Sequence, residues 1–358
     1  MSFIKCFLLT YPPISIVISF AIGLCFMPFV IHIAKRKHLV VKPNKRTSHE
    51  GLVPNIGGLD IFIALSGTYV VGLLFTLSVP LLAAMAVMFL VGFIDDLVDL
   101  TPFWKLVGET LAAVFLIVFG QVRIFSLYGL FGIETLAPGW SYVLSLIALW
   151  GIVNAFNLID GVDGLASGLG MLYCLFFGIY FQCVGQQLLA ASAYACIGAL
   201  AIFFIYNVFG HRHKIFMGDS GSLLIGLILT LFVFRFMELN WRGEVPEVLQ
   251  MTAAPAVAIC VMFVPLFDTM RVMLTRIKKK QSPFIADKNH IHHLLLRIGL
   301  KHKQITYVLL TVSSIFMALG LVGRNWPIWL LIFTACALGT ALIFMLWRVL
   351  NHMTNSHN

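Results

Sequence analysis

Long apolar runs recur along the whole chain, and short polar segments separate them. Each run holds about 20 residues, enough for an α-helix to cross about 30 Å of hydrocarbon. The pattern therefore predicts an all-α, polytopic integral membrane protein with about eleven transmembrane helices. The expected spans lie at about residues 12–34, 58–77, 80–96, 104–120, 140–158, 164–182, 187–209, 218–237, 251–274, 305–323 and 326–347.

Composition strengthens this prediction. Of the 358 residues, 60% are hydrophobic and only 11% are charged, whereas a soluble domain carries about 25% charged residues. The seven cysteines are scattered without a C-x-x-C pair, so we interpret them as small apolar residues. We expect a single transmembrane domain over residues 1–358, with catalytic motifs within 45–300 and a C-terminal helical pair at 305–347.

The basic residues fall mainly in alternate loops. If the N-terminus is outside, the cytoplasmic segments hold 19 of the 24 Lys and Arg residues. This bias predicts an N-out, C-in topology. We attribute the net charge of +9 to this topology signal and to anionic ligands, and it gives no support for nucleic-acid binding.

Acidic residues gather at the predicted cytoplasmic ends of the spans. Repulsion and desolvation oppose such a cluster unless a ligand offsets them. We therefore expect a divalent cation and a polyanionic substrate at this face of the membrane. The clustered residues are Asp95, Asp96, Asp99, Asp160, Asp163, Asp219, Asp268 and Asp287.

Two motifs place aspartates at helix ends. In VGFIDDLVDL, Asp95 and Asp96 point about 100° apart on a helix, so one can meet a cation while the other acts as a base. A hydrated helix end is the alternative interpretation. In FMGDSGSLLIG, Asp219 lies where a helix N-terminus points amides toward a phosphate, and its carboxylate suits Mg²⁺. Asp219 as a simple N-cap is the alternative.

The stretch NAFNLIDGVDGLASG concentrates polar side chains at the end of an apolar run. Asn154, Asn157 and Asp160 are spaced three apart, so they share one helical stripe about 120° wide. Asp163 projects from the glycine-rich turn that follows. Helix capping and turn formation explain one or two of these residues but not all four.

The stretch SPFIADKNHIHHLLLRIGL lies in the largest predicted cytoplasmic loop. Its clustered histidines are a candidate zinc site. Nearby Lys288 and Arg297 instead favour a cationic rim that binds phosphate. The first cytoplasmic loop adds His49 before a Pro-Gly-Gly entry into the second span, which alone is a weak signal.

Together and in this order, these motifs resemble the polyprenyl-phosphate N-acetylhexosamine-1-phosphate transferase superfamily over roughly residues 35–300. The resemblance implies Mg²⁺-dependent transfer, with Mn²⁺ as an alternative ion, of a sugar 1-phosphate from a UDP-N-acetylhexosamine to undecaprenyl phosphate with release of UMP. Partners would be these two substrates and the lipid bilayer. A homodimer is left open.

The resemblance also implies residue roles. Asp219 and Asn157 match metal-binding positions, and Asp95 or Asp96 would deprotonate the lipid phosphate. The remaining catalytic candidates are Asp160, Asp163, His290, His292 and His293. The substrate-binding candidates are His49, Asn154, Asn157, Lys214, Phe216, Lys288 and Arg297. Phe216 matches an aromatic residue that stacks on uracil, although packing alone also explains a phenylalanine there.

The long DDLVDL form and the basic HRHK segment favour the GlcNAc-1-phosphate branch, which initiates O-antigen, enterobacterial common antigen or teichoic acid. The alternative is the phospho-MurNAc-pentapeptide transferase branch of peptidoglycan synthesis, which Ile291 disfavours because it interrupts the histidines. Gln281 stands where the motif would have glycine. We prefer one-step attack by the lipid phosphate, and a covalent phospho-aspartyl route stays open.

A cation-coupled transporter is the alternative from a different class, because intramembrane carboxylates and broken helices suit one. It predicts acids near the bilayer midplane and two repeated halves. Here the acids gather at one face, and no internal repeat stands out.

Overall fold

The computed structural model describes residues 10–37, 39–41, 53–73, 79–210, 213–281 and 289–355. His49 and Lys288 lie outside these residues. The described elements are mostly helical, with one short antiparallel pair of strands, β1 (Val40–Val41) and β2 (Val53–Pro54). The α-helices are α2 (Ile14–Arg36), α3 (Gly57–Thr68), α4 (Val79–Val98), α5 (Pro102–Ala113), α6 (Pro138–Leu158), α7 (Leu165–Cys183), α8 (Gln187–Phe209), α9 (Gly218–Arg242), α10 (Ala254–Val261), α11 (Phe263–Lys278), α12 (Ile291–Arg297), α13 (His302–Val322) and α14 (Ile328–Asn355). Two π-helical segments, η1 (Tyr69–Leu73) and η2 (Val114–Phe119), continue α3 and α5.

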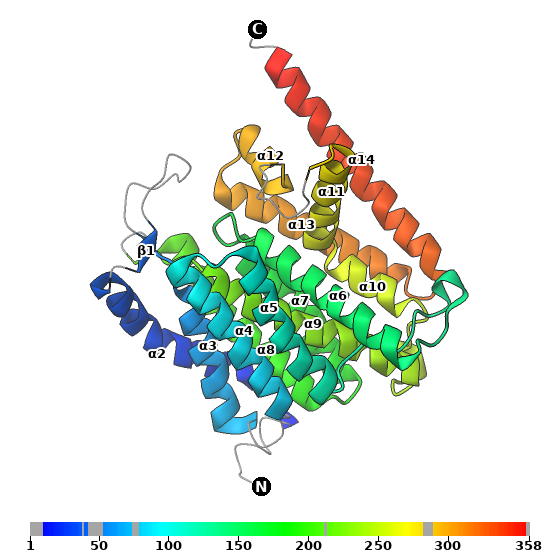
Figure 1. Cartoon of the computed structure of the whole chain (residues 1–358), viewed down its shortest axis with the longest axis horizontal. Coiled ribbons are helices and arrows are strands. Elements are labelled where there is room, and N and C mark those ends of the chain that lie inside the picture. Colours follow the sequence, from blue (N-terminus) through cyan, green and yellow to red (C-terminus); the bar gives the residue numbers. More distant parts are fainter. Residues whose placement is uncertain are drawn as a thin grey trace.

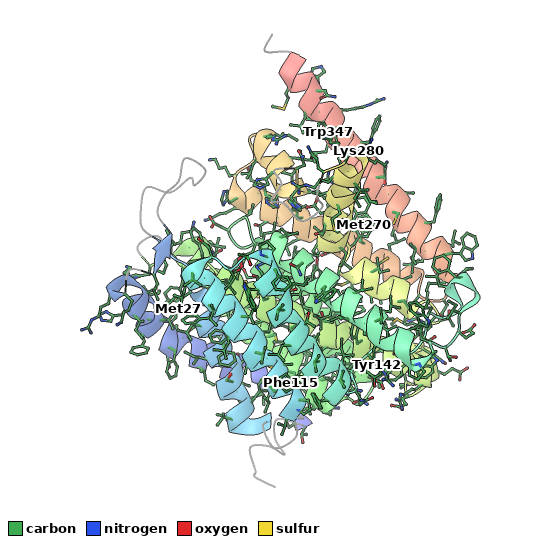
Figure 2. All side chains as sticks on the ribbon, viewed as in Figure 1. Met27, Phe115, Tyr142, Met270, Lys280 and Trp347 are labelled. Carbon is green, nitrogen blue, oxygen red and sulfur yellow. The ribbon has the colours of Figure 1, made fainter. Side chains whose placement is uncertain are left out.

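Among the described residues, nine helices are long and apolar enough to cross a membrane. This identifies a multi-pass membrane protein, as the apolar pattern predicted. Of the eleven expected spans, the second corresponds to a shorter apolar helix, Gly57–Val71. Large apolar side chains, including Phe29, Leu90 and Ile147, are exposed and suit contact with lipid. Figure 2 shows side chains covering the whole bundle.

The expected span at 251–274 differs from the structure. Two helices, α10 and α11, replace it and meet at an angle of 87°. Pro265 lies in the first turn of α11 and has no backbone N–H, so it cannot continue the hydrogen-bond ladder from α10. The bend turns the second half of this segment toward α12 and α13 (Figure 1).

Helix α9 forms the centre of the bundle, and 94% of its most apolar 18-residue stretch is buried inside the protein. Glycines allow its first turn to approach two neighbours. A Cβ on Gly58 of α3 would lie 2.2 Å from the backbone nitrogen of Gly221, and one on Gly92 of α4 would lie 2.5 Å from the carbonyl oxygen of Asp219. The start of α9 is therefore held between α3 and α4, where only glycines leave room for its backbone.

The C-terminal helices pack on one side of this bundle. α13 contacts α7, α10 and α11, while α14 runs beside α10. Figure 1 shows the far end of α14 projecting beyond the other helices, in the direction of α11 and α12. Trp347 lies on this projecting part (Figure 2).

Candidate active site

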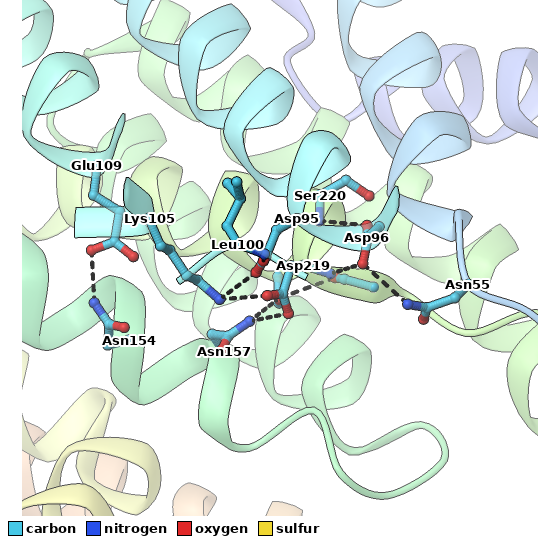
Figure 3. Close-up of polar contacts among 12 residues, drawn as sticks. Asn55, Asp95, Asp96, Leu100, Lys105, Glu109, Asn154, Asn157, Asp219 and Ser220 are labelled. Carbon is cyan, nitrogen blue, oxygen red and sulfur yellow. Dashed lines mark hydrogen bonds and ion pairs between the residues drawn. The ribbon is translucent and has the colours of Figure 1, made fainter. Parts of the chain in front are cut away.

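Polar side chains from four segments meet beside the first turn of α9: the end of α4, the start of α5, the end of α6 and α9 itself (Figure 3). Asp95 and Asp96 come from α4, Asn157 comes from α6 and Asp219 begins α9. These four sequence-predicted residues are brought together. Their surroundings show that they have different partners.

Lys105 of α5 occupies the middle of this cluster. Its ammonium forms ion pairs with Asp219 and with Asp95, the latter at 3.1 Å. One lysine therefore reduces the repulsion between two neighbouring carboxylates. Lys105 belongs to none of the motifs described above. A lone basic residue at a helix start directly after an acidic motif was the available clue.

Asn157 donates a hydrogen bond of 2.8 Å to Oδ1 of Asp219 and another of 2.8 Å to the hydroxyl of Ser222. These contacts join the last turn of α6 to the first turn of α9. Asn157 and Asp219, the two predicted metal-binding residues, are thus in direct contact, and their binding of a metal stays a prediction. The Oδ2 atom of Asp219 accepts a hydrogen bond from the ammonium of Lys105, and its Oδ1 atom accepts one from the amide of Asn157.

Asp96 caps α9 from a neighbouring helix. It accepts the backbone N–H groups of Asp219 at 2.8 Å and Ser220 at 3.0 Å, and the side-chain amide of Asn55 at 3.1 Å. Gly218 makes this approach possible, because its φ is +72° and a Cβ there would lie 2.6 Å from Asp96. The expectation that these amides face a phosphate is therefore wrong: a carboxylate already accepts both of them. Asp219 as the N-cap is also wrong, because Met217 holds that position.

Asn154 faces a residue that the motif did not suggest. Its amide donates to Oε2 of Glu109 at 2.8 Å and to the carbonyl of Trp150 at 3.0 Å. Glu109 lies one helical turn beyond Lys105 on α5 and is only 1% exposed. The amide nitrogen is thus occupied, which leaves the Asn154 oxygen as the atom that can meet another group.

The turn at residues 159–164 carries Asp160 and Asp163. Asp163 forms an ion pair with Lys214 at 2.7 Å and contacts Nδ1 of His302 at 3.0 Å. Burial opposes ionisation, but the hydrogen bonds from His302 and Lys214 hold the pKa of Asp163 below its ordinary value. Buried Asn207 accepts from the N–H of Gly164 and donates to the carbonyl of Ile215, so it joins this turn to the segment before α9.

Asp160 has a different environment from Asp163. Burial, followed by the charges of Asp219 and Asp96, raises the pKa of Asp160 well above its usual range. Within the described ranges, no ion pair of Asp160 is found that would offset these charges. A carboxyl group in this position favours an added cation or a proton.

The histidines of the HIHH segment lie near the 159–164 turn, where His292 contacts Gly161. His292 is 2% exposed, and a Cβ on Gly161 would lie 2.8 Å from its Nε2 atom. Burial, and then the neighbouring His293, lowers the pKa of His292 to about 3. A neutral His292 can donate or accept a hydrogen bond but carries no charge, so the expected cationic rim stays a prediction for Lys288 and Arg297. His290 is also buried and contacts Asp268 of α11.

Two further substrate-binding candidates precede α9. The ammonium of Lys214 lies 5.5 Å from the ring centre of Phe216. The backbone of Phe216 donates to the carbonyl of Pro54 at 2.8 Å and accepts from the N–H of Gly57 at 2.9 Å. Arg297 is exposed on α12. The structure thus gives Phe216 a backbone role in aligning two segments, and its stacking on a base stays a prediction.

The donor set fits a magnesium ion that binds together with a phosphorylated substrate. Mg²⁺ typically takes one or two carboxylates and completes its shell with water and phosphate oxygens. Asp219 offers a carboxylate and Asn157 an amide oxygen, and the two side chains touch through the amide nitrogen of Asn157. No group of three or more His, Cys, Asp or Glu side chains that could hold a metal by itself occurs in the part of the chain that the structure describes.

Comparison with known proteins identifies related sequences. Residues 78–237 match glycosyl transferase family 4. The undecaprenyl-phosphate alpha-N-acetylglucosaminyl 1-phosphate transferase of Escherichia coli (strain K12) is 32% identical over 297 residues, which cover 82% of this chain and 78% of that protein. The same-named protein of Yersinia pestis is 30% identical over 94% of this chain and 92% of its own. A probable undecaprenyl-phosphate N-acetylglucosaminyl 1-phosphate transferase of Bacillus subtilis (strain 168) is 31% identical over 89% of this chain and 87% of its own.

Proposed function

The chain belongs to glycosyl transferase family 4, and on this premise we propose that it transfers GlcNAc-1-phosphate from UDP-GlcNAc to undecaprenyl phosphate. The products are undecaprenyl-pyrophosphate-GlcNAc and UMP. The observation that carries the proposal is the contact of Lys105 with both Asp95 and Asp219 beside Asn157. This arrangement concentrates charge where two phosphorylated substrates must meet. The peptidoglycan branch and a transporter are not favoured by the relatives.

The reaction joins one phosphate to another. An oxygen of the lipid phosphate attacks the phosphorus that carries GlcNAc, and the bond from this phosphorus to the bridging oxygen breaks. The electron pair leaves with UMP. Catalysis of such a transfer depends mainly on positioning and on offsetting negative charge.

Lys105 is the residue that offsets this charge. Its ammonium can exchange a carboxylate partner for a phosphate oxygen, because both are anionic acceptors. That exchange would leave Oδ2 of Asp95 without its lysine partner and able to take a proton from the lipid phosphate. Asp96 is less suited to this role, because backbone amides and Asn55 hold both of its oxygens. We therefore assign the base to Asp95.

Asp219 and Asn157 would hold Mg²⁺, with Mn²⁺ as the alternative ion. The bound ion would neutralise charge on the diphosphate and favour departure of UMP. Asp160, whose carboxyl faces the charges of Asp219 and Asp96, lies next to this position. The amide of Asn157 would turn its oxygen toward the ion.

We assign the nucleotide to the side of the site formed by the 159–164 turn and the segment before α9. Lys214 and Phe216 lie here, and Asp163 holds Lys214. His290, His292 and His293 line the other side of the turn, toward the pyrophosphate. His49, Asn154, Lys288 and Arg297 stay proposed substrate contacts.

The apolar helices suit a lipid substrate whose long chain stays in hydrocarbon while its phosphate reaches the interface. We place the protein in the bacterial inner membrane, N-out and C-in, as a single domain with the site on the cytoplasmic side. Its product would initiate a lipid-linked surface polysaccharide of the O-antigen, enterobacterial common antigen or teichoic acid type.

Purified protein with undecaprenyl phosphate, Mg²⁺ and a panel of UDP-sugars tests this proposal. We expect release of UMP and formation of lipid-pyrophosphate-GlcNAc with UDP-GlcNAc, and much less with UDP-GalNAc or UDP-MurNAc-pentapeptide. Folded protein that releases no UMP from any UDP-N-acetylhexosamine would overturn the transferase. Preference for another donor would overturn the GlcNAc assignment alone.

A further inference from the structure

Asp268 of α11 is buried, at 3% exposure, and none of the steps above uses it. It lies beyond the 87° bend between α10 and α11, which carries it to the start of α12. Its two oxygens have several partners. Oδ1 accepts from the guanidinium of Arg271 at 2.7 Å, and the N–H of Ile291 lies 3.0 and 3.1 Å from the two oxygens.

The remaining partner of Asp268 is a histidine of the predicted motif. Nδ1 of His290 lies 3.0 Å from Oδ2 of Asp268, and this histidine is only 5% exposed. An Asp carboxylate that already accepts from a guanidinium and a backbone amide acts as an acceptor here. The proton of a neutral His290 therefore resides on Nδ1. Its Nε2 atom is left as the acceptor of a hydrogen bond or a proton.

Asp268 also positions a second histidine through α12. Arg271 donates to the carbonyl of Asn289, and Asp268 accepts from Ile291, so both sides of His290 are held at the start of this helix. The rings of His290 and His292 are nearly parallel, with centres 5.9 Å apart. The ring of His292 in turn lies against Gly161 in the turn that carries Asp160.

We propose that Asp268 is a positioning residue for the transfer reaction: it holds His290 in the tautomer with a free Nε2 acceptor and seats α12 against the 159–164 turn. The role rests on the proposed function, because it concerns the same site. Asp268 itself touches no substrate. It acts as the carboxylate behind other functional histidines does, by orienting the ring and selecting its tautomer.

The variant Asp268→Asn tests this role with little change in shape. The asparagine can still accept from Ile291, but its amide nitrogen would donate to His290 and reverse the tautomer. We expect kcat to fall about 10- to 100-fold, with the KM for UDP-GlcNAc within about twofold of the wild type. A wild-type kcat would overturn the proposal.

A double-mutant cycle separates this role from a general loss of structure. Because Asp268→Asn keeps an acceptor for Ile291 at the start of α12, it should act through His290 alone, and adding it to His290→Gln should lower kcat no further. Losses that multiply would overturn the proposal. Glu238→Gln is the matched control, because Glu238 is also a buried carboxylate in ion pairs, with Arg235 at 2.5 Å and Arg242 at 2.9 Å, near the other end of α9. Its kcat should stay unchanged.

A measurement on the wild-type protein does not depend on any variant folding. The ¹⁵N chemical shifts of the His290 ring, assigned by their loss in His290→Gln, report which nitrogen is protonated. We expect protonation at Nδ1, and the Nε2–H tautomer would overturn the proposal. A wild type that transfers no sugar phosphate refutes the proposed function, whereas an active wild type with an equally active Asp268→Asn refutes only this inference.

Discussion

The carboxylate of Asp96 accepts the backbone N–H of Asp219 at 2.8 Å, across 123 residues of sequence. Asp96 thereby caps the helix that presents Asp219 to the site. Its neighbour Asp95 instead pairs with Lys105. Two adjacent aspartates of one motif therefore have different partners: Asp96 accepts the helix amides, and Asp95 pairs with the lysine of the site.

This difference predicts a stability effect at Asp96. Asp96→Ala leaves the amides of Asp219 and Ser220 without their acceptor, so we expect the free energy of unfolding to fall by about 1–2 kcal/mol. Asp95→Asn should keep the wild-type melting temperature and lose most UMP release. Thermal unfolding in detergent, with turnover measured on the same samples, checks both. Equal melting temperatures for the two variants would contradict the assigned roles.

Lys105 should be essential for the rate. Lys105→Met removes the only cation that contacts both Asp95 and Asp219 among the described residues, and we expect kcat to fall about 10²- to 10³-fold. The matched control is Lys37→Met at the exposed end of α2, which should keep the wild-type rate. Steady-state release of UMP measures both variants. Full activity of Lys105→Met would remove the lysine from the mechanism.

The contact between Gly161 and His292 predicts sensitivity to one methyl group. Gly161→Ala would place its Cβ 2.8 Å from Nε2 of His292 and push the histidine or the turn aside. We expect activity to fall about 10- to 100-fold. Gly151→Ala on the exposed side of α6 is the control, because nothing lies within 4 Å of its added Cβ. If both variants retain activity, the fit of His292 against the turn does not matter for turnover.

Buried His292 also predicts acid sensitivity. Its pKa in the folded protein is about 3 against the ordinary 6.5, so between these values the unfolded chain binds more protons. Protonation of the unfolded chain then lowers the free energy of unfolding as the pH falls from 6.5 toward 3, by up to about 1.4 kcal/mol per pH unit. We expect the melting temperature of His292→Gln to depend less steeply on pH than that of the wild type between pH 7.5 and pH 5. The exposed His352→Gln should follow the wild-type curve.

The proposed orientation can be tested at two exposed positions. In a chain whose native cysteines are replaced by serine, Lys280→Cys after α11 should react with a membrane-impermeant maleimide only from the cytoplasmic side. Glu244→Cys after α9 should react only from the outer side. Labelling of spheroplasts and inverted vesicles compares the two. The reverse pattern would invert the topology.

Several features of the fold and the site could be predicted from single residues and their spacing. The apolar runs foretold a helical membrane protein, because a helix must satisfy its own backbone in hydrocarbon. The spacing of Asn154 and Asn157 placed both on one helical stripe. The structure has them on α6, facing Glu109 and Asp219 respectively.

Other features depended on neighbours that periodicity does not reveal. Lys105 and Glu109 belong to none of the motifs that the sequence analysis described. Pro265 is a visible helix breaker, but an angle of 87° between α10 and α11 follows from the packing around it. The partnership of Asp268 with His290 exists only because that bend brings α11 to the start of α12.

The sequence by itself determined that most of the apolar runs form long helices of a membrane protein, because hydrophobic length acts locally along the chain. Only the tertiary structure decided which polar residues touch. Glycines such as Gly58 and Gly92 let α3 and α4 approach the first turn of α9, and this packing gives Asp96 the helix amides and leaves Asp95 and Asp219 to share Lys105. Helical periodicity specifies the face on which a side chain lies, whereas the partner on that face depends on how distant helices pack.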